Sequence, residues 1–180
     1  MGVILLRHPR PRIRPGTCYG RLDVPAGPGA AAEIAACLKI APPIRAVVAS
    51  PATRCRTLAT RLAARDGVPL RFDPRLLELD FGRWEGQAWD RIPRAESDPW
   101  AASPWETAPP GGESFSRLHA RVAAALAEAP EGAALVTHAG VIRAVWMIRG
   151  GARFDTVFAR SVPYATALAD RLSPRETPCI

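Results

Sequence analysis

Lysine is almost absent from this sequence: of the 24 basic residues among 180, all but Lys39 are arginines. The formal net charge of +7 favours anionic partners, namely phosphate esters, nucleic acid or an acidic membrane surface. Arginine suits phosphate in particular, because its guanidinium group offers two parallel N–H donors. A GC-rich genome explains the same bias more simply, since alanine, proline and glycine are also frequent. The net charge alone therefore does not indicate a function.

Long apolar runs and paired cysteines are also missing. After Met1 and Gly2 the first apolar run is only four residues long, too short for a secretion signal, and no stretch approaches a transmembrane span. The cysteines form neither a CxxC pair nor a metal-ligand pattern. They are Cys18, Cys37, Cys55 and Cys179. We therefore expect a cytoplasmic protein with reduced thiols and no membrane partner.

The composition indicates one folded domain. Hydrophobic residues make up 48% of the chain, which argues against disorder, and 180 residues suffice for a sizeable core. No internal repeat or linker divides the sequence, so we expect a single domain over residues 1–180. Residues 80–111 are rich in tryptophan, proline and glycine and show little periodicity, which predicts a lid-like insertion there.

Short apolar segments alternate with helix-like segments along the chain. Strands are predicted over residues 3–6, 44–50, 69–73, 133–137 and 161–172, the last weakened by Pro163. Helices are predicted over residues 29–40, 51–67, 112–132 and 138–151. For the second helix, Ser50 is the expected N-cap, Pro51 the first residue and Gly67 the end. The alternation predicts an α/β fold with a largely parallel sheet.

Histidines and arginines follow the ends of three predicted strands. Ligands of open α/β sheets bind beyond the carboxyl ends of the strands, so these side chains are expected to meet at one edge. They are Arg7 and His8 after the first strand, Ser50 and Arg54 after the second, and His138 after the fourth. The helix after His138 also offers the free N–H groups of Ala139 and Gly140 to an anion. Together these groups predict a pocket for a tetrahedral phosphate dianion.

Such a pocket suits phosphoryl transfer, in which catalysis is mostly positioning and charge stabilisation. His8 is the candidate nucleophile, because an imidazole nitrogen can take up a phosphoryl group. Arg7, Arg54 and His138 would hold the phosphoryl oxygens. Whether the neighbouring arginines of the same segment touch substrate is left open. They are Arg10, Arg12 and Arg14.

A leaving alkoxide needs a proton, and three carboxylates stand close together in "LLELDFGRWEG". Glu78 follows two leucines, and partial burial there would favour its protonated form. Asp80 and Glu85 are rivals by residue type, and spacing does not choose among the three. Trp84 and Trp89 are candidates to flank an aromatic leaving group.

Five blocks of the sequence, in this order, resemble the histidine phosphatase superfamily, in the branch that includes cofactor-dependent phosphoglycerate mutases. They are "LLRH", "ASPATRCRTLA", "LLELDFGRWEG", "PPGGES" and "LVTHAGVIRAV". The resemblance implies a three-layer α/β sandwich, helices on both faces of the sheet, and a phosphohistidine mechanism without metal or other cofactor. By position it makes His8 the nucleophile and Glu78 the proton donor. It assigns phosphate contacts to Arg7, Arg54 and His138, and substrate contacts to Tyr19 and Gly20.

Within that superfamily, "PGTCYGRLDVP", "ELDFGRWEGQAWDRI" and "PPGGES" resemble α-ribazole phosphatases. Those enzymes remove the 5′-phosphate of α-ribazole 5′-phosphate late in cobalamin assembly. The chain departs from the family at Pro9, where glycine is usual, and at Ala26, where leucine is usual. Both departures bear on substrate choice.

The expected activity is thus hydrolysis of a small-molecule phosphate monoester, namely α-ribazole 5′-phosphate. A broad-specificity sugar or nucleotide phosphatase is the alternative, and a mutase is less favoured because no second phosphate site is evident. A non-catalytic anion or nucleic-acid binder is the remoter alternative. Binding alone would require neither Glu78 nor a histidine nucleophile, so no nucleic-acid partner is expected. The oligomeric state is left open.

Overall fold

The computed structural model describes residues 2–172 of the chain. Its strands are β1 (Ile4–Arg7), β2 (Ala46–Ala49), β3 (Leu70–Phe72), β4 (Ala133–Thr137) and β5 (Ala167–Ala169). Its α-helices are α1 (Ala30–Ile40), α2 (Thr53–Asp66), α3 (Arg94–Ala102), α4 (Phe115–Ala127), α5 (Ala139–Gly150) and α6 (Phe154–Phe158). Its short 3-10 helices are η1 (Pro74–Leu76), η2 (Gly82–Trp84) and η3 (Trp89–Arg91).

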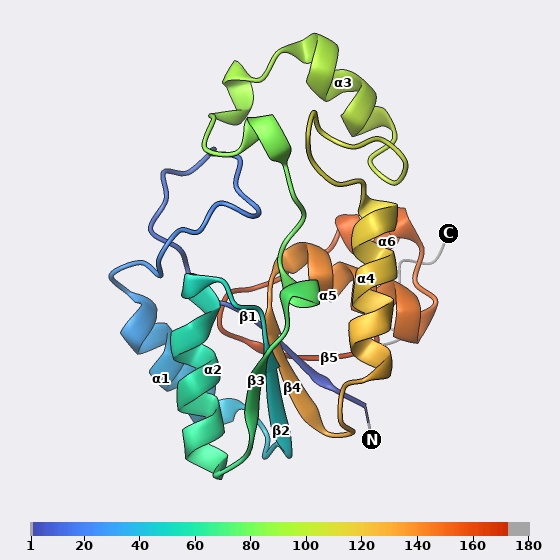
Figure 1. The fold of residues 1–180 in the computed structure, drawn as a ribbon. Helices are drawn as coiled ribbons and strands as arrows, with labels where there is room; N and C mark the ends of the chain where they lie inside the picture. Colours follow the sequence, from blue (N-terminus) through green and yellow to red (C-terminus); the bar gives the residue numbers. More distant parts are fainter. Residues whose placement is uncertain (1, 173–180) are drawn as a thin grey trace.

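The described strands form one sheet in the order β3-β2-β4-β1-β5 (Figure 1). β1, β2, β3 and β4 run parallel, and β5 pairs with β1 in the antiparallel sense. Strands of a parallel sheet are covered on both faces, which explains the continuous apolar runs in β2 and β4. The predicted α/β fold with a mostly parallel sheet is therefore confirmed.

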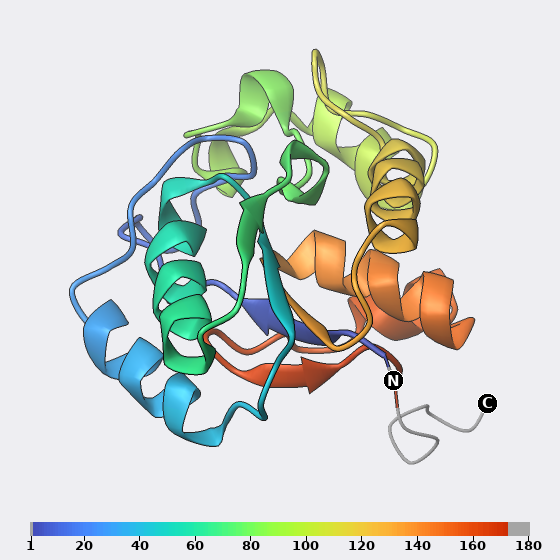
Figure 2. The same ribbon diagram turned by 60° about the horizontal axis from the view of Figure 1, so that its bottom comes forward.

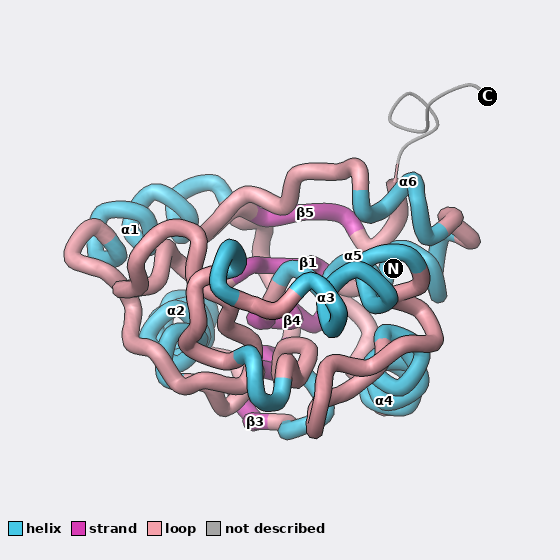
Figure 3. Tube along the Cα trace, turned by 90° about the horizontal axis from the view of Figure 1, so that it is seen from above, coloured by secondary structure: helices cyan, strands magenta, loops and turns pink. Residues whose placement is uncertain are grey.

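Helices cover both faces of this sheet. α1 and α2 lie on one face and α4, α5 and α6 on the other, as two views of the ribbon show (Figure 1, Figure 2). Seen from above, the strands stand in a row between these two groups of helices (Figure 3). Neighbouring residues of β1 serve both layers, because side chains alternate along a strand. Leu5 packs into the core beneath α4 and α5, and Leu6 packs into the core beneath α1 and α2.

Residues 80–111 lie above the carboxyl ends of the strands (Figure 1). This segment carries η2, η3 and α3, and it has a small hydrophobic cluster of its own, in which Cys18, Trp84 and Ile92 are buried. Cys18 comes from the loop after β1, so that loop and the segment are packed together. The edge of the sheet where we expect the site is thus covered by these two pieces of chain.

The structure differs from the sequence-based expectation at four places. α2 begins at Thr53, not at Pro51, and Ala52 is its N-cap, while the Ser50 hydroxyl accepts the Ala52 N–H and also contacts His138. The helices α3 and α6 were not expected. β5 occupies three residues of the strand predicted over residues 161–172, because the positive φ of Ala165, 43°, interrupts the extended backbone just before it.

Two further expectations concern the cysteines and membrane-spanning segments. Cys18, Cys37 and Cys55 are free thiols and are buried, and Cys179 lies outside the described residues. None of the helices formed by residues 2–172 combines the length and apolar character needed to cross a bilayer.

Candidate active site

The pairing of β1 with β4 brings the two candidate histidines together. Arg7 is in register with Thr137, so the residues that follow them, His8 and His138, leave the sheet side by side. The backbone N–H of His8 donates to the Thr137 carbonyl oxygen over 2.9 Å. The two imidazole rings meet edge to face with their centroids 5.1 Å apart. Residues from the two ends of the sequence thus form one cluster.

The environment of His8 keeps its ring neutral and fixes its tautomer. The residue is 2% exposed, and its Nδ1 lies 2.7 Å from the carbonyl oxygen of Pro9. A carbonyl only accepts hydrogen bonds, so Nδ1 carries the proton and Nε2 keeps the lone pair. Burial, together with the charges of Arg54 and Arg7, lowers the pKa of His8 to about 3. The imidazole is therefore neutral and nucleophilic at neutral pH.

His138 is also held neutral. It is fully buried, and its Nε2 lies 2.8 Å from the Ser50 hydroxyl oxygen. Burial is the main cause that puts its pKa well below the usual value, and the neighbouring His8 and Arg54 act in the same direction. If the Ser50 hydroxyl donates to Nε2, the tautomer present carries its proton on Nδ1. That nitrogen is then a neutral N–H donor.

Arg54 and Arg7 supply positive charge to the same cluster. Arg54 is 1% exposed, and its terminal nitrogens donate to the carbonyl oxygens of Gly20 at 2.6 Å and Leu22 at 3.0 Å. Arg7 donates to the carbonyl oxygen of Val162 over 2.6 Å. The Arg7 guanidinium also lies 3.8 Å from the centroid of the Tyr164 ring, a cation–π contact. Backbone carbonyls and an aromatic ring fix both guanidinium groups in place.

Several buried polar atoms of this cluster have no hydrogen-bond partner among residues 2–172. They are Arg7 Nε, Arg54 Nε and His138 Nδ1. A buried donor left unpaired costs about 1–3 kcal/mol, so three of them in one place are unusual outside a functional site. Donors that converge from two guanidinium groups and an imidazole suit the oxygens of a phosphoryl group.

The three candidate carboxylates have different partners. Glu78 accepts the backbone N–H of Leu79 at 3.0 Å and that of Gly140 at 3.1 Å, so its carboxylate sits at the start of α5, two residues after His138. Asp80 accepts the N–H of Gly82 in a local turn. Glu85 accepts four backbone N–H groups and shapes the loop after β1. Only Glu78 of the three contacts the helix that follows His138.

Glycine is required at position 140 for this arrangement. A Cβ atom there would overlap Oε1 of Glu78 and would lie 3.3 Å from its Cδ. Gly140 and the preceding Ala139 form the first turn of α5, whose free N–H groups favour a negative charge. The carboxylate therefore occupies one of the N–H groups that the sequence predicted for a phosphate.

The predicted substrate loop lies against the arginines. Gly20 accepts a hydrogen bond from Arg54, and the Arg54 guanidinium lies 5.4 Å from the centroid of the Tyr19 ring. The Tyr19 hydroxyl lies 3.4 Å from that of Tyr164. Burial raises the pKa of Tyr19, so the phenol stays protonated near the arginines. Arg10 pairs with Glu33 on the outside of the same loop.

Sequence reasoning placed Ser50 at this edge of the sheet but missed Tyr164. Ser50 had also been expected as a helix cap, and its hydroxyl accepts the Ala52 N–H at 3.3 Å as well as binding His138. Tyr164 contacts both Arg7 and the His8 ring, whose centroid lies 5.6 Å away. Its position between the end of α6 and β5 follows no periodic pattern, and no signal in the sequence would have found it.

Two cavities open beside the cluster. One, of about 100 Å³, is lined by Glu78, Gly140 and Arg143 together with aromatic rings. The rings belong to Phe81, Trp100, Phe115 and Phe158. The other, of about 260 Å³, lies along the loop after β1, and its lining includes Arg10, Arg14, Tyr19 and Tyr164.

The tryptophans expected beside a leaving group are not the ones at the cavity. Trp84 is 1% exposed, and its indole N–H donates to the Glu96 carboxylate, so it belongs to the small hydrophobic cluster. Trp89 is 39% exposed, and its ring stacks on that of Trp100. Trp100 and Phe81 line the cavity instead.

No group of three or more histidine, cysteine, aspartate or glutamate side chains within residues 2–172 is arranged to hold a metal ion.

Comparison with solved structures shows two related enzymes. A phosphoglycerate mutase from Thermus thermophilus is 29% identical, with a TM-score of 0.74 over 93% of this chain and 91% of that one. A mycobacterial glucosyl-3-phosphoglycerate phosphatase is 26% identical, with a TM-score of 0.70 over 87% of this chain and 82% of that one.

Among curated proteins, a bifunctional protein of Mycobacterium tuberculosis is 39% identical over 83 residues. The match covers 44% of this chain and 22% of that protein, so it extends over about a fifth of the relative. The family model described as histidine phosphatase superfamily, branch 1, matches residues 3–173. The chain belongs to the histidine phosphatase superfamily, whose members related to it in structure include a phosphatase and a mutase.

Proposed function

We propose that the protein is a phosphomonoester hydrolase that works through phosphorylated His8. The observation that carries this proposal is the neutral, buried His8 ring, whose Nε2 lone pair is free while Nδ1 is held by Pro9. Guanidinium N–H groups of Arg7 and Arg54 without partners among residues 2–172 accompany it. A nucleophile and anion-binding donors in one buried cluster are the two requirements of phosphoryl transfer to an enzyme.

The reaction proceeds in two balanced steps. In the first, Nε2 of His8 attacks phosphorus, and the P–N bond forms as the bond to the leaving oxygen breaks. The Glu78 carboxyl group gives its proton to that oxygen. In the second, the Glu78 carboxylate takes a proton from water, the water oxygen bonds to phosphorus, and the P–N bond breaks. Inorganic phosphate leaves, and His8 regains its lone pair.

The other members of the cluster hold the transferred group. N–H donors of Arg7 and Arg54 and the N–H of His138 would bind the phosphoryl oxygens, each charge-assisted contact contributing about 1.5–3 kcal/mol. The catalytic gain comes from contacts that strengthen as charge develops in the transition state. Ala139 offers a backbone N–H near the substrate, Gly20 holds Arg54 through its carbonyl oxygen, and Tyr19 borders the arginines.

For the substrate, we propose α-ribazole 5′-phosphate or a close relative with an aromatic leaving group. The cavity of about 100 Å³ beside Glu78 supports this choice, because its lining is aromatic and its rim contains the carboxyl group that must reach the leaving oxygen. Ring-lined cavities favour flat apolar groups. A broad-specificity sugar or nucleotide phosphatase is the alternative. Comparable kcat/KM values across α-ribazole 5′-phosphate and a panel of sugar and nucleotide monophosphates would favour it.

The chemistry itself is tested by turnover of p-nitrophenyl phosphate in the presence of EDTA. We expect the wild-type protein to release inorganic phosphate, His8→Ala to be inactive, and brief exposure to substrate followed by acid-free digestion to show phosphate on His8. If the wild-type protein binds phosphate but does not turn over p-nitrophenyl phosphate, it is an anion-binding protein. Release of phosphate to water, with no transfer to a second substrate alcohol, separates the hydrolase from a mutase.

A further inference from the structure

The backbone leading to Glu78 is held by side chains rather than by regular structure. After η1 the chain neither continues a helix nor joins the sheet, so the carbonyl groups of residues 75–78 need other partners. Arg121 of α4 donates to three of them, and the Thr137 hydroxyl donates to the fourth, that of Leu76, over 2.8 Å. The position of this segment therefore depends on two side chains from α4 and β4.

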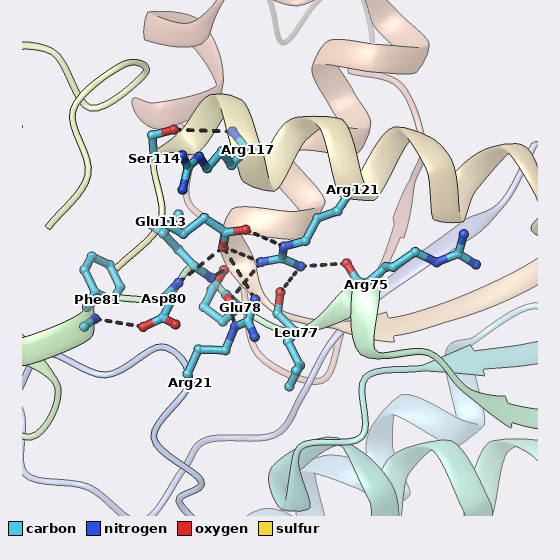
Figure 4. Close-up of polar contacts among 12 residues, drawn as sticks. Arg21, Arg75, Leu77, Glu78, Asp80, Phe81, Glu113, Ser114, Arg117 and Arg121 are labelled. Atoms are coloured by element: carbon cyan, nitrogen blue, oxygen red, sulfur yellow. Dashed lines mark hydrogen bonds and ion pairs between the residues drawn. The ribbon is translucent and has the colours of Figure 1, made fainter. Parts of the chain in front are cut away.

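Arg121 uses all of its hydrogen-bonding capacity in this contact (Figure 4). One terminal nitrogen donates to the carbonyl oxygens of Arg75 and Leu77, both at 2.6 Å. The other donates to the carbonyl oxygen of Glu78 at 3.0 Å and to Glu113 at 2.8 Å, and Nε donates to Glu113 at 2.7 Å. A guanidinium group has five N–H donors, and each has an acceptor here.

Glu113 completes the clamp. Its carboxylate faces Arg121 with both oxygens, the paired geometry that is strongest between these two groups. The side chains of Arg121 and Glu113 are only 16% and 13% exposed, so solvent screens this pair weakly. Arg21 adds a hydrogen bond of 3.2 Å to the Glu78 carbonyl oxygen from the other side. Glu113 belongs to the "PPGGES" block, whose role the mechanism does not use.

We propose that Arg121 is a positioning residue for the Glu78 carboxyl group. Glu78 is held at two points: its carboxylate binds the first turn of α5, and its backbone carbonyl binds Arg121 of α4. Without Arg121 the carbonyl groups of Arg75 and Leu77 lose their donor and that of Glu78 keeps only Arg21. The segment can then shift while His8 and the arginines of the anion pocket stay in place. This inference rests on the proposed function, in which Glu78 protonates the leaving oxygen.

The consequence is a dependence on the leaving group. p-Nitrophenolate is a stable anion and departs with little help from an acid, whereas the alkoxide of glycerol 2-phosphate needs the proton. General acid catalysis contributes about 10²- to 10⁴-fold, so Arg121→Met should lower kcat/KM for glycerol 2-phosphate by about tenfold or more. For p-nitrophenyl phosphate the loss should stay below about threefold. The ratio kcat/KM is used because it reports the steps up to departure of the leaving group.

The chain contains a matched control, Arg65, in the last turn of α2, at the end of that helix away from Arg54. Arg65 also makes five hydrogen bonds, two to the carboxylate of Asp66 and three to backbone carbonyls. Those carbonyls are Leu38, Ala41 and Pro42. Arg65 lies twelve positions after Thr53, the first residue of α2, and thus about 18 Å from it along the helix. Arg65→Met removes the same kind of contact, and it should change both substrates equally and by less than about twofold.

The outcome is read as the ratio of the two substrates in each variant. Selective loss on glycerol 2-phosphate in Arg121→Met, absent in Arg65→Met, supports the proposal; equal losses on both substrates overturn it. In a Glu78→Gln background, Arg121→Met should have no further selective effect, because it acts through Glu78. If Arg121→Met does not fold, Arg121→Lys and Arg65→Lys give the same comparison, since lysine has three donors in place of five. If Glu78→Gln leaves both activities at the wild-type level, the proposed function itself is refuted.

Discussion

Replacement of Gly140 by alanine tests the role of Glu78 without changing any titratable group. The backbone at Gly140 is helical, so alanine adopts it without strain and gains up to about 1 kcal/mol of helix propensity. The added methyl group, however, overlaps Oε1 of Glu78. To restore van der Waals separation the carboxylate must move by about 1 Å. It then loses its hydrogen bonds to the Gly140 N–H.

Two magnitudes follow from this displacement. Loss of the hydrogen bond between the Gly140 N–H and the Glu78 carboxyl group costs at most about 3 kcal/mol, which the gain in helix propensity offsets in part. Domains are stable by about 5–15 kcal/mol, so Gly140→Ala should fold. Misplacement of a reacting group by about 1 Å costs up to about 10²-fold in rate. A hundredfold loss corresponds to about 2.7 kcal/mol of transition-state stabilisation.

The assay is kcat/KM for glycerol 2-phosphate, with the free energy of unfolding measured by urea titration. Gly150→Ala is the control in the same helix, because a Cβ atom there would meet Arg171 and Leu172 only at 3.8 Å, an ordinary contact. We expect Gly140→Ala to lose most of its activity while remaining folded, and Gly150→Ala to keep it. A folded Gly140→Ala protein with at least a third of the wild-type kcat/KM would refute the assignment of Glu78 as proton donor.

Further predictions concern the anion pocket. Arg54→Lys keeps the charge but loses the paired donors, and it should lower kcat/KM by about 10- to 100-fold; wild-type rates would contradict it. Inorganic phosphate should raise the Tm of the wild-type protein and not that of Arg54→Met, because ligand binding to the folded state stabilises it; equal shifts would place the phosphate elsewhere. Because the pKa values of His8 and His138 are lowered, the unfolded chain binds protons below pH 6.5 that the folded chain does not. Stability should therefore fall with pH from 6.5 toward 3, by at most about 1.4 kcal/mol per pH unit for each histidine, and urea midpoints that stay flat between pH 7 and pH 5 would contradict this.

The sequence was sufficient to predict the sheet and the meeting of His8 with His138. Both follow from a general property of parallel sheets, in which the carboxyl ends of buried strands share one edge. The register of Arg7 with Thr137 turns that rule into a specific contact. Periodicity likewise located α4, whose buried stripe contains Leu118 and Val122 as expected.

The remaining features depend on the path of the chain outside regular structure. α3 has no buried residue and contains Pro99, so neither periodicity nor composition predicts a helix there. The choice between Glu78 and Glu85 depends on which loop each carboxylate reaches, and Glu85 reaches the backbone of Gly20. Tyr164 contributes through non-local contacts with Arg7, His8 and Tyr19. Sequence spacing contains no information on contacts of this kind.

The place of β1 in the sheet has a consequence for biosynthesis. Of the described strands β1 is the first to be made, yet its neighbours β4 and β5 are the last two. At a translation speed of about 5–20 residues per second, His8 waits on the order of ten seconds before His138 and Tyr164 emerge. Pairings between such distant segments also form slowly. The nascent chain therefore carries His8 apart from His138 and Tyr164 until the segments that contain them have been made.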